Sequence, residues 1–457
     1  MKKFFTLLLA VISTMTAFAQ TEPAIELQAE VDGNTRTFSI GLATEGTVQI
    51  DWGNGEKVTS EVIPAFDGWN QVNVSGTVSG EGKVKIYGDN IVCFECSSTV
   101  KGAKVLSLDV TKATALKDLT ANTNKLTSID LTKNTELEKL TISNNQLTSI
   151  DISKCTKLTT LDISNNLLTA IDITKNQALL TLRIGQNKLA GELDLSTNPT
   201  IKLVYAQTNE LTSVKIGNNT ASKPTFSFNE NKLTSFDATG IKDAGNATLF
   251  LISNQLTEIT LPSTKMKSIN ISKNNFTLAT LPAPSVAKTL TYAPQADYAI
   301  AETYKVGDVL DLSSLTNATL NTQFQVMKSD KTALTEGTDY TVADGKITFL
   351  TAQEAVYVTM SSTLYSKFTG TNIYKTTVTK VEGDTGINTV TTQGVKVSTI
   401  GNEITISGLA QGDAVTVANL GGAVVANFHA NSANAHVQAA KGLYIVSING
   451  KAIKVAL

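Results

Sequence analysis

The chain has 457 residues, of which 38 are basic and 40 acidic, and three are cysteine. Nothing in this balance supplies the basic face that nucleic-acid binding needs, so no nucleic acid is expected as a partner. Three cysteines exclude a disulfide framework, and the length allows several domains.

Residues 1–19 read as a secretory signal peptide. Lys2 and Lys3 precede an apolar run over 4–12, and Ala17-Phe18-Ala19 forms a small-residue cleavage site. The alternative is a membrane anchor, but the run is too short to span a bilayer. Because no other stretch is apolar enough, we expect an exported protein without a transmembrane segment after signal removal.

Residues 20–90 alternate apolar and polar side chains between tight turns, which predicts antiparallel strands. Asp51-Trp52-Gly53-Asn54-Gly55 resembles the D-W-G-D-G turn of PKD-type immunoglobulin-like domains, with Asn54 where that family has Asp. A calcium loop is the alternative, although the full acidic spacing is missing. We expect a hairpin with Trp52 in the core and a domain that caps the repeats that follow.

Residues 91–284 contain a repeat. An asparagine recurs at nearly constant intervals, with apolar residues five before, three before and two after it. This L-x-x-L-x-L-x-x-N-x-L spacing predicts a leucine-rich repeat solenoid with short coils and a parallel concave sheet. The expected asparagine row, which we assign to satisfying backbone groups at a sharp turn, is Asn124, Asn145, Asn166, Asn187, Asn209, Asn231, Asn254 and Asn274.

The second half of each repeat also alternates, as in Ile129-Asp-Leu131. The alternation predicts an extended back strand with its acidic residue outward. A solvated row, partly neutralised by the lysines three positions later, is favoured over a cation site. The row comprises Asp109, Asp130, Asp151, Asp172, Asp194 and Asp237.

The repeat Leu137-x-x-Leu140-x-Ile-Ser-Asn-Asn-Gln-Leu-Thr-Ser-Ile-Asp-Ile resembles internalin J-like 21-residue leucine-rich repeats and those of many bacterial surface proteins. Those repeats often carry a cysteine where this chain has Ala121 and Ile142, so the cysteine ladder is absent. Cys96 stands at the same inward position. For Cys93-x-x-Cys96 we therefore expect core packing, with a redox or metal pair as the alternative.

Beyond the repeats, strand-like runs over 285–380 fit an immunoglobulin-like β-sandwich, and 381–394 reads as a linker. The expected fold is therefore mainly β, a leucine-rich repeat solenoid flanked by immunoglobulin-like sandwich domains. Residues 395–457 form a last compact β segment with an early turn at Asn419-Leu-Gly-Gly422.

This last segment resembles the C-terminal sorting domain of type IX secretion cargo. The residues that carry the resemblance are Gly442, Tyr444, Val446, Lys454 and Val455, in a K-G-x-Y-x-V strand and a closing K-V strand. The resemblance implies recognition by the type IX secretion machinery, passage across the outer membrane, and secretion or anchoring on the cell surface. A further immunoglobulin-like module is the alternative.

Chemistry-bearing residues are sparse. The two histidines, His429 and His436, both lie in the last segment. If that segment is removed on export, no Ser-His-Asp, Cys-His or His-zinc arrangement is available. We therefore expect no enzyme, no cofactor and no metal, with a carboxylate-only glycoside hydrolase as a remote alternative.

The concave sheet is the expected binding face, because residues beside the inward apolar pair point outward. Most of them are Thr, Ser or Asn, so apolar and aromatic exceptions indicate a partner. The alternative is that the C-terminal sandwich covers them. We predict a secreted or surface protein, an adhesin for example, that binds a protein or glycan there, and the alternative function is a structural spacer. The candidate partner-binding residues are Arg183, Tyr205, Leu203, Phe250, Ile252 and Asp162.

Overall fold

The computed structural model describes residues 22–58, 62–63, 71–99, 101–383, 389–392, 394–400 and 402–457. The signal peptide predicted over 1–19 lies outside these residues. The chain divides into two compact units, Met1–Asn274 with Pro282–Tyr292, and Asn275–Leu281 with Ala293–Leu457. Strands dominate the described residues. The helices among them are single 3-10 turns, at Ala244–Asn246, Pro284–Val286, Ser313–Leu315 and Gly370–Asn372.

The N-terminal region packs two antiparallel sheets around Phe38 and Trp52, whose rings stack at 5.2 Å. Trp52 is buried, as the sequence predicts. A Cβ on Gly76 would lie 2.1 Å from the indole, so only glycine fits there. The first sheet has the order β10 (Val105–Asp109), β1 (Ile25–Ala29), β8 (Lys83–Tyr87), β4 (Gln49–Asp51) and β5 (Lys57–Val58). A short hairpin pairs β3 (Gly46–Thr47) with β6 (Val62–Ile63).

The second N-terminal sheet continues into the solenoid. β9 (Ile91–Glu95) pairs antiparallel with β2 (Thr35–Leu42), which in turn pairs with β7 (Val72–Thr77). On its other side β9 pairs parallel with β11 (Asp118–Thr120). One 12-stranded sheet therefore covers both the cap and the repeats, because no break in hydrogen bonding separates them.

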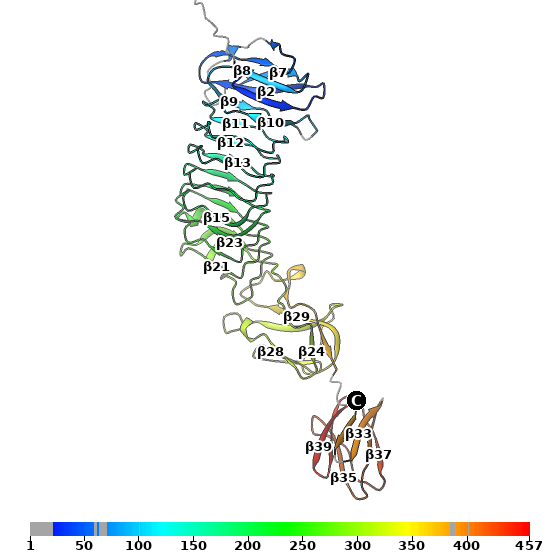
Figure 1. The fold of residues 1–457 in the computed structure, drawn as a ribbon. Helices are drawn as coiled ribbons and strands as arrows, with labels where there is room; N and C mark the ends of the chain where they lie inside the picture. The colour runs from blue at the N-terminus through cyan, green and yellow to red at the C-terminus, as the bar shows by residue number, and fades with distance from the viewer. Residues whose placement is uncertain are drawn as a thin grey trace, which may run out of the picture. The chain divides into compact units, whose positions relative to one another are not determined.

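The parallel part of this sheet is the concave face that the repeat predicts (Figure 1). Each strand contains an apolar residue that is buried and points inward. After β11 the strands are β12 (Lys139–Thr141), β13 (Thr160–Asp162), β14 (Thr181–Arg183), β16 (Leu203–Tyr205), β18 (Thr225–Ser227), β20 (Thr248–Phe250), β22 (Met266–Asn270) and β23 (Ala287–Thr291).

The predicted asparagine row seals the turn after each strand. In coil three, counting the coil of Asn124 as the first, Asn166 Nδ2 donates to the carbonyls of Ile142 and Ile163 at 3.1 Å, and its Oδ1 accepts from Leu147 N at 3.0 Å. All eight asparagines accept such a bond from the preceding coil. The residue before each has positive φ, such as Asn165 at 54°, so the amide stabilises a sharp turn.

A second asparagine row, which the sequence analysis missed, lies deeper in the coils. Asn176 Nδ2 donates to the carbonyls of Ile152 at 3.0 Å and Cys155 at 2.8 Å. Cys155 itself occupies the row position of coil two. Unlike the first row, three members have a buried Oδ1 without a hydrogen-bond partner among the described residues. The row comprises Asn134, Asn176, Asn198 and Asn219, with the unpartnered acceptors on Asn134, Asn176 and Asn219.

The prediction that every coil has a back strand is wrong. Back strands of neighbouring coils pair only as β15 (Ala190–Asp194) with β17 (Glu210–Lys215) and β19 (Ser235–Asp237) with β21 (Glu258–Thr260), within the described residues. In coil one Leu131 is buried as expected, but Asp130 accepts from Thr132 N at 2.9 Å. The same bond follows Asp194 and Asp237, which lie in the paired strands, so this aspartate turn occurs both with and without strand pairing.

The repeats also extend past the predicted end at residue 284. β23 pairs parallel with β22, and Leu290 and Tyr292 are buried in the positions of the two apolar frame residues. In the second unit, Gln295 Oε1 accepts from Phe276 N, much as Asn274 Oδ1 accepts from Leu256 N one coil earlier. The asparagine pattern does not include this last coil, because Gln295 stands where the earlier coils have asparagine.

Residues 293–383 form two β-sheets, as the sandwich prediction requires. The first has the order β24 (Thr303–Lys305), β31 (Thr379–Glu382), β29 (Gln353–Ser361) and β26 (Gln323–Lys328), with β30 (Tyr374–Lys375) beside β29. The second has the order β25 (Val309–Asp311), β28 (Lys346–Phe349) and β27 (Tyr340–Ala343).

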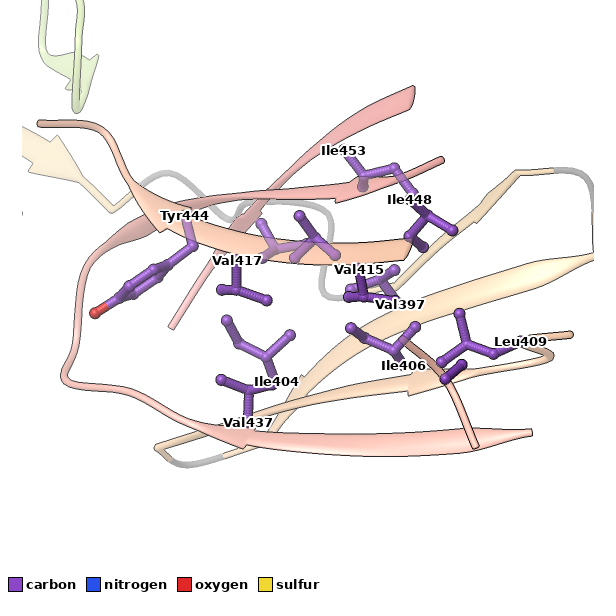
Figure 2. Close-up of a cluster of buried hydrophobic side chains, with 13 residues drawn as sticks. Val397, Ile404, Ile406, Leu409, Val415, Val417, Val437, Tyr444, Ile448 and Ile453 are labelled. Carbon is purple, nitrogen blue, oxygen red and sulfur yellow. The ribbon is translucent and has the colours of Figure 1, made fainter. Parts of the chain in front are cut away.

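The C-terminal domain is a sandwich of two four-stranded sheets around one buried cluster (Figure 2). Its strand β32 (Thr389–Thr392) falls inside the predicted linker 381–394 yet pairs with β33 (Val395–Ile400). The segment was predicted to be a linker because most of its residues there are polar threonines. The remaining strands are β34 (Glu403–Ser407), β37 (Asn434–Gln438), β36 (Val424–His429), β35 (Ala414–Asn419), β38 (Leu443–Ile448) and β39 (Lys451–Ala456).

Candidate functional site

The outward residues of the parallel strands form an ordered grid. Because the strands pair in register, Arg183 lies beside Tyr205, and Leu203 lies beside Thr181. Neighbouring strands are about 4.8 Å apart, so residues on adjacent coils are in reach of one another. The expected adjacency of Arg183 and Tyr205 is therefore present, even though the repeat that joins them is slightly longer than those before it.

Arg183 stacks on Tyr205. Its guanidinium carbon lies 5.6 Å from the ring centroid, which is a cation–π contact. Asp162 pairs in register with Arg183 on the other side, yet its Oδ1 accepts from Ser164 N at 3.1 Å and Ser164 Oγ at 2.6 Å. No ion pair of Arg183 occurs within the described part of the chain. The hydrogen bonds of Asp162 therefore stabilise its local turn.

The apolar candidates lie on the coils that follow. Leu203, Phe250 and Ile252 are half-buried although they occupy outward positions. Ser227, small and buried, lies in register between Tyr205 and Phe250. We call Arg183, Leu203, Tyr205, Phe250 and Ile252 the concave patch.

Exposed leucines extend this patch beyond the predicted positions. Leu180, 46% exposed, stands two positions before the first apolar residue of its strand, at the edge of the sheet where strands begin. Leu167, 40% exposed, follows the ladder residue Asn166 at the opposite edge. Sequence reasoning missed both because it considered only the residues flanking the inward pair.

Charge is unevenly distributed along the concave face. Coils one to three carry outward Asp118 and Asp162, and Asp118 pairs with Lys139 at 2.9 Å. In the later concave strands β14, β16, β18, β20, β22 and β23, all within the described residues, no acidic residue occupies an outward position. The edge position of Leu180 holds exposed lysines in three other coils, and none of them forms an ion pair with a described residue. They are Lys202, Lys267 and Lys288.

The back row of aspartates makes local hydrogen bonds. Within the described ranges, no group of three or more His, Cys, Asp or Glu side chains could hold a metal ion. Instead Asp130, Asp151 and Asp172 each accept from the backbone N–H two positions later, and this bond lowers the pKa of each carboxyl. The expected lysines three positions later, Lys133, Lys154 and Lys175, lower the pKa of the same carboxyls further through their charge. In addition, Lys215 pairs with Asp194 of the preceding coil at 3.2 Å.

The cysteines are packing residues, as expected for Cys93 and Cys96. All three are buried and free. Burial raises the pKa of the Cys93 and Cys96 thiols to about 12 and that of Cys155 to about 11. Such thiols stay protonated and unreactive at neutral pH.

In the PKD-like turn, Asp51 Oδ1 accepts from Gly53 N at 2.8 Å and Gly55 N at 3.0 Å, so this carboxylate closes its own hairpin.

The residues of the predicted sorting tail have structural places in the C-terminal sandwich. Tyr444 on β38 pairs with Val455 on β39, and both are buried together with Val446. Figure 2 shows Tyr444 at one end of the cluster, with its hydroxyl directed away from it; that hydroxyl donates to Ala440 O at 2.7 Å. Lys454 is exposed on β39, and Gly442 precedes β38.

Short parallel strands, one per coil, and an asparagine seal after each strand from β11 to β22 of the concave sheet define a leucine-rich repeat protein. A family model described as Leucine Rich repeats (2 copies) matches residues 135–176. A second model, a Domain of unknown function (DUF6383), matches residues 384–457. No curated protein matches the chain.

Several solved structures are similar to the chain. The functional domain of InlJ from Listeria monocytogenes, which includes a cysteine ladder, is 20% identical over 64% of this chain and 67% of its own, with a TM-score of 0.43. Listeria monocytogenes InlP is 15% identical over 60% and 77%, with a TM-score of 0.35. YopM from Yersinia enterocolitica WA-314 is 19% identical over 47% and 49%, with a TM-score of 0.34.

None of the helices in the described residues is long and apolar enough to cross a membrane.

Proposed function

We propose that this leucine-rich repeat protein is exported to the cell surface and binds a partner through the concave patch. The carrying observation is the stack of Arg183 on Tyr205 beside half-buried Leu203 and Phe250, at positions that elsewhere hold Thr, Ser or Asn. Arg and Tyr are preferred anchors of interfaces, and their pre-formed stack lowers the entropy lost on binding. The activity is non-covalent binding, as in an adhesin.

The same face supports binding better than a spacer role. A spacer needs only polar outward residues, and coils one to three have them, such as Thr120 and Thr141. Apolar side chains on later coils lower solubility without adding to the solenoid core beneath. Their presence at outward positions therefore favours a ligand.

A binding screen tests this proposal. The full chain is applied to a glycan array and to a display library of protein fragments, beside the double variant Arg183→Ala, Tyr205→Ala. Ligands that the chain retains and the double variant loses support binding through the patch. Thr120→Ala, at the same outward position in coil one, is the matched control and keeps every ligand. If the double variant retains all ligands, the patch is not the binding site.

Export is proposed on two grounds, the signal-like stretch over 1–19 and the sorting-like tail. The structure sharpens the test of the tail, because deleting 440–457 removes β38 and β39 and with them half of one sheet. Deletion of the whole domain, 384–457, leaves no broken sandwich behind. Loss of surface display in that deletion, with the repeats still folded inside the cell envelope, supports a sorting role. Unchanged display contradicts it.

A further inference from the structure

We propose that the concave patch takes an acidic protein segment bearing apolar side chains. This inference rests on the proposed function and names the partner's chemistry. Its ground is a division of charge along the concave face. Coils one and three present Asp118 and Asp162, with Lys139 between them on coil two. The later concave strands β14, β16, β18, β20, β22 and β23 present Arg183 and no outward carboxylate, with Lys202, Lys267 and Lys288 along the edge where strands begin.

Arg183 is the electrostatic anchor. Asp162, the nearest carboxylate in register, is occupied by Ser164, and the guanidinium leans over Tyr205 on the opposite side. Its N–H donors are therefore available to an incoming carboxylate. A planar guanidinium held by an aromatic ring binds a carboxylate in a fixed geometry, at a smaller entropic cost than a free side chain.

The edge lysines extend this field. Lys202 precedes β16, while Lys267 and Lys288 lie in β22 and β23 at the same frame position. In coils one and two that position holds Lys117 and Glu138, which pair with each other at 3.3 Å. The later lysines lack such a partner among the described residues. The opposite edge carries Glu230 and Lys273 just before the ladder asparagines, and these balance each other in charge. Just after the asparagines it carries Lys188, Glu210 and Lys232, of which Glu210 and Lys232 pair at 2.9 Å, so the field of the later coils is positive.

The apolar members favour a protein over a sugar. Leu203 and Ile252 are aliphatic, and aliphatic side chains complement the side chains of a peptide rather than the hydroxylated surface of a glycan. A sugar ring would stack on a free aromatic face, but one face of Tyr205 is already covered by Arg183. Phe250 stands two strands further on, about 10 Å away.

The spacing defines the segment. Arg183 and Phe250 are three strands apart, about 14 Å, which an extended peptide spans in about four residues. Side chains two positions apart point to the same side of such a peptide. The fitting sequence is therefore an acid followed by apolar residues two and four positions later.

Defined peptides test the inference. The full chain is titrated with synthetic peptides containing Glu-Ser-Leu-Ser-Phe, Lys-Ser-Leu-Ser-Phe or Glu-Ser-Ser-Ser-Ser, and with a uronate oligosaccharide. We expect the acidic-apolar peptide to bind at least about tenfold more tightly than the others, with affinity that falls as salt rises. We expect Arg183→Glu to reverse the preference, so that the peptide containing Lys-Ser-Leu-Ser-Phe binds more tightly than the one containing Glu-Ser-Leu-Ser-Phe. Tyr205→Ala lowers the affinity for both of these peptides. Lys139→Glu, a charge reversal on coil two, changes affinity less than about twofold.

The outcomes separate the inference from the proposed function. Tyr205-dependent binding of the lysine peptide, or of the uronate oligosaccharide alone, leaves a working concave site and overturns the acidic-apolar assignment. Absence of binding by all four probes also overturns it, whereas the fragment and glycan screen decides independently whether the patch binds anything. An acidic peptide whose binding survives Arg183→Glu contradicts the anchor role.

Discussion

The two asparagine rows use the same residue at nearly the same period, yet they differ in how the side-chain amide is hydrogen-bonded. In the first row, the amide of Asn166 serves both as donor and as acceptor, and its Oδ1 is the hydrogen-bond partner of Leu147 N. In the second row, the donors of Asn176 are used while its buried Oδ1 has no partner in the described structure. Burial of an asparagine is thus not a measure of its contribution; the pairing of both ends of the amide is.

The largest expected effect is from Asn166→Ala. It removes the donors to Ile142 and Ile163 and leaves the buried Leu147 N–H unsatisfied. We expect a loss of about 3 kcal/mol or more in the free energy of unfolding, measured by urea titration. Thr141→Ala, outward on the neighbouring strand, is the control and changes the midpoint little. A loss below about 1 kcal/mol would contradict a larger contribution of the first row to the free energy of unfolding.

Asn176→Ala should cost less, about 1 to 2 kcal/mol in the same titration. The carbonyls it leaves keep other partners, since Ile152 O accepts from Cys155 N and Cys155 O from Leu158 N. Removal of an unpartnered acceptor offsets part of the loss. A cost equal to that of Asn166→Ala would show that the unpartnered Oδ1 has no energetic consequence.

Cys155→Asn completes the second row. By the repeat relation, the new amide donates to Leu131 O, which Cys155 Sγ now contacts at 3.8 Å. Because the gain of donor bonds opposes one more unpartnered acceptor, we expect stability to change by less than about 1 kcal/mol. A drop above about 2 kcal/mol in the urea titration would mean that coil two requires the smaller thiol.

The smallest effect concerns the exposed aspartates. Backbone donors lower the pKa of Asp130, Asp151 and Asp172 in the folded state, so their contribution is present above the unfolded pKa of about 4 and is lost as pH falls through the folded values. Replacing all three by Asn keeps an acceptor but removes the titration. The variant should show a shallower fall of the unfolding midpoint than the parent between about pH 5 and about pH 2. Identical acid profiles would exclude these carboxyls as the cause.

The sequence was sufficient for the parallel sheet and the first asparagine row, because Leu161, Ile163 and Asn166 recur in fixed phase. It was insufficient for the second row, since Ala113 and Cys155 interrupt the asparagines there. The back strands failed because alternation around Asp130 arises from a turn as well as from a strand. The phase of the repeat was sufficient to place Arg183 and Tyr205 on the concave face. Leu180 was identified only from its exposure in the structure.

The side-chain amide of each ladder asparagine, as at Asn166, bonds within its own coil and the one before it. A new coil therefore brings its own seal and needs nothing from distant coils. Duplication or loss of a whole repeat leaves every remaining junction intact, so the number of coils is free to drift in descent. What cannot drift is the coil at which Arg183 and Tyr205 meet, because one coil inserted between them would separate the stack.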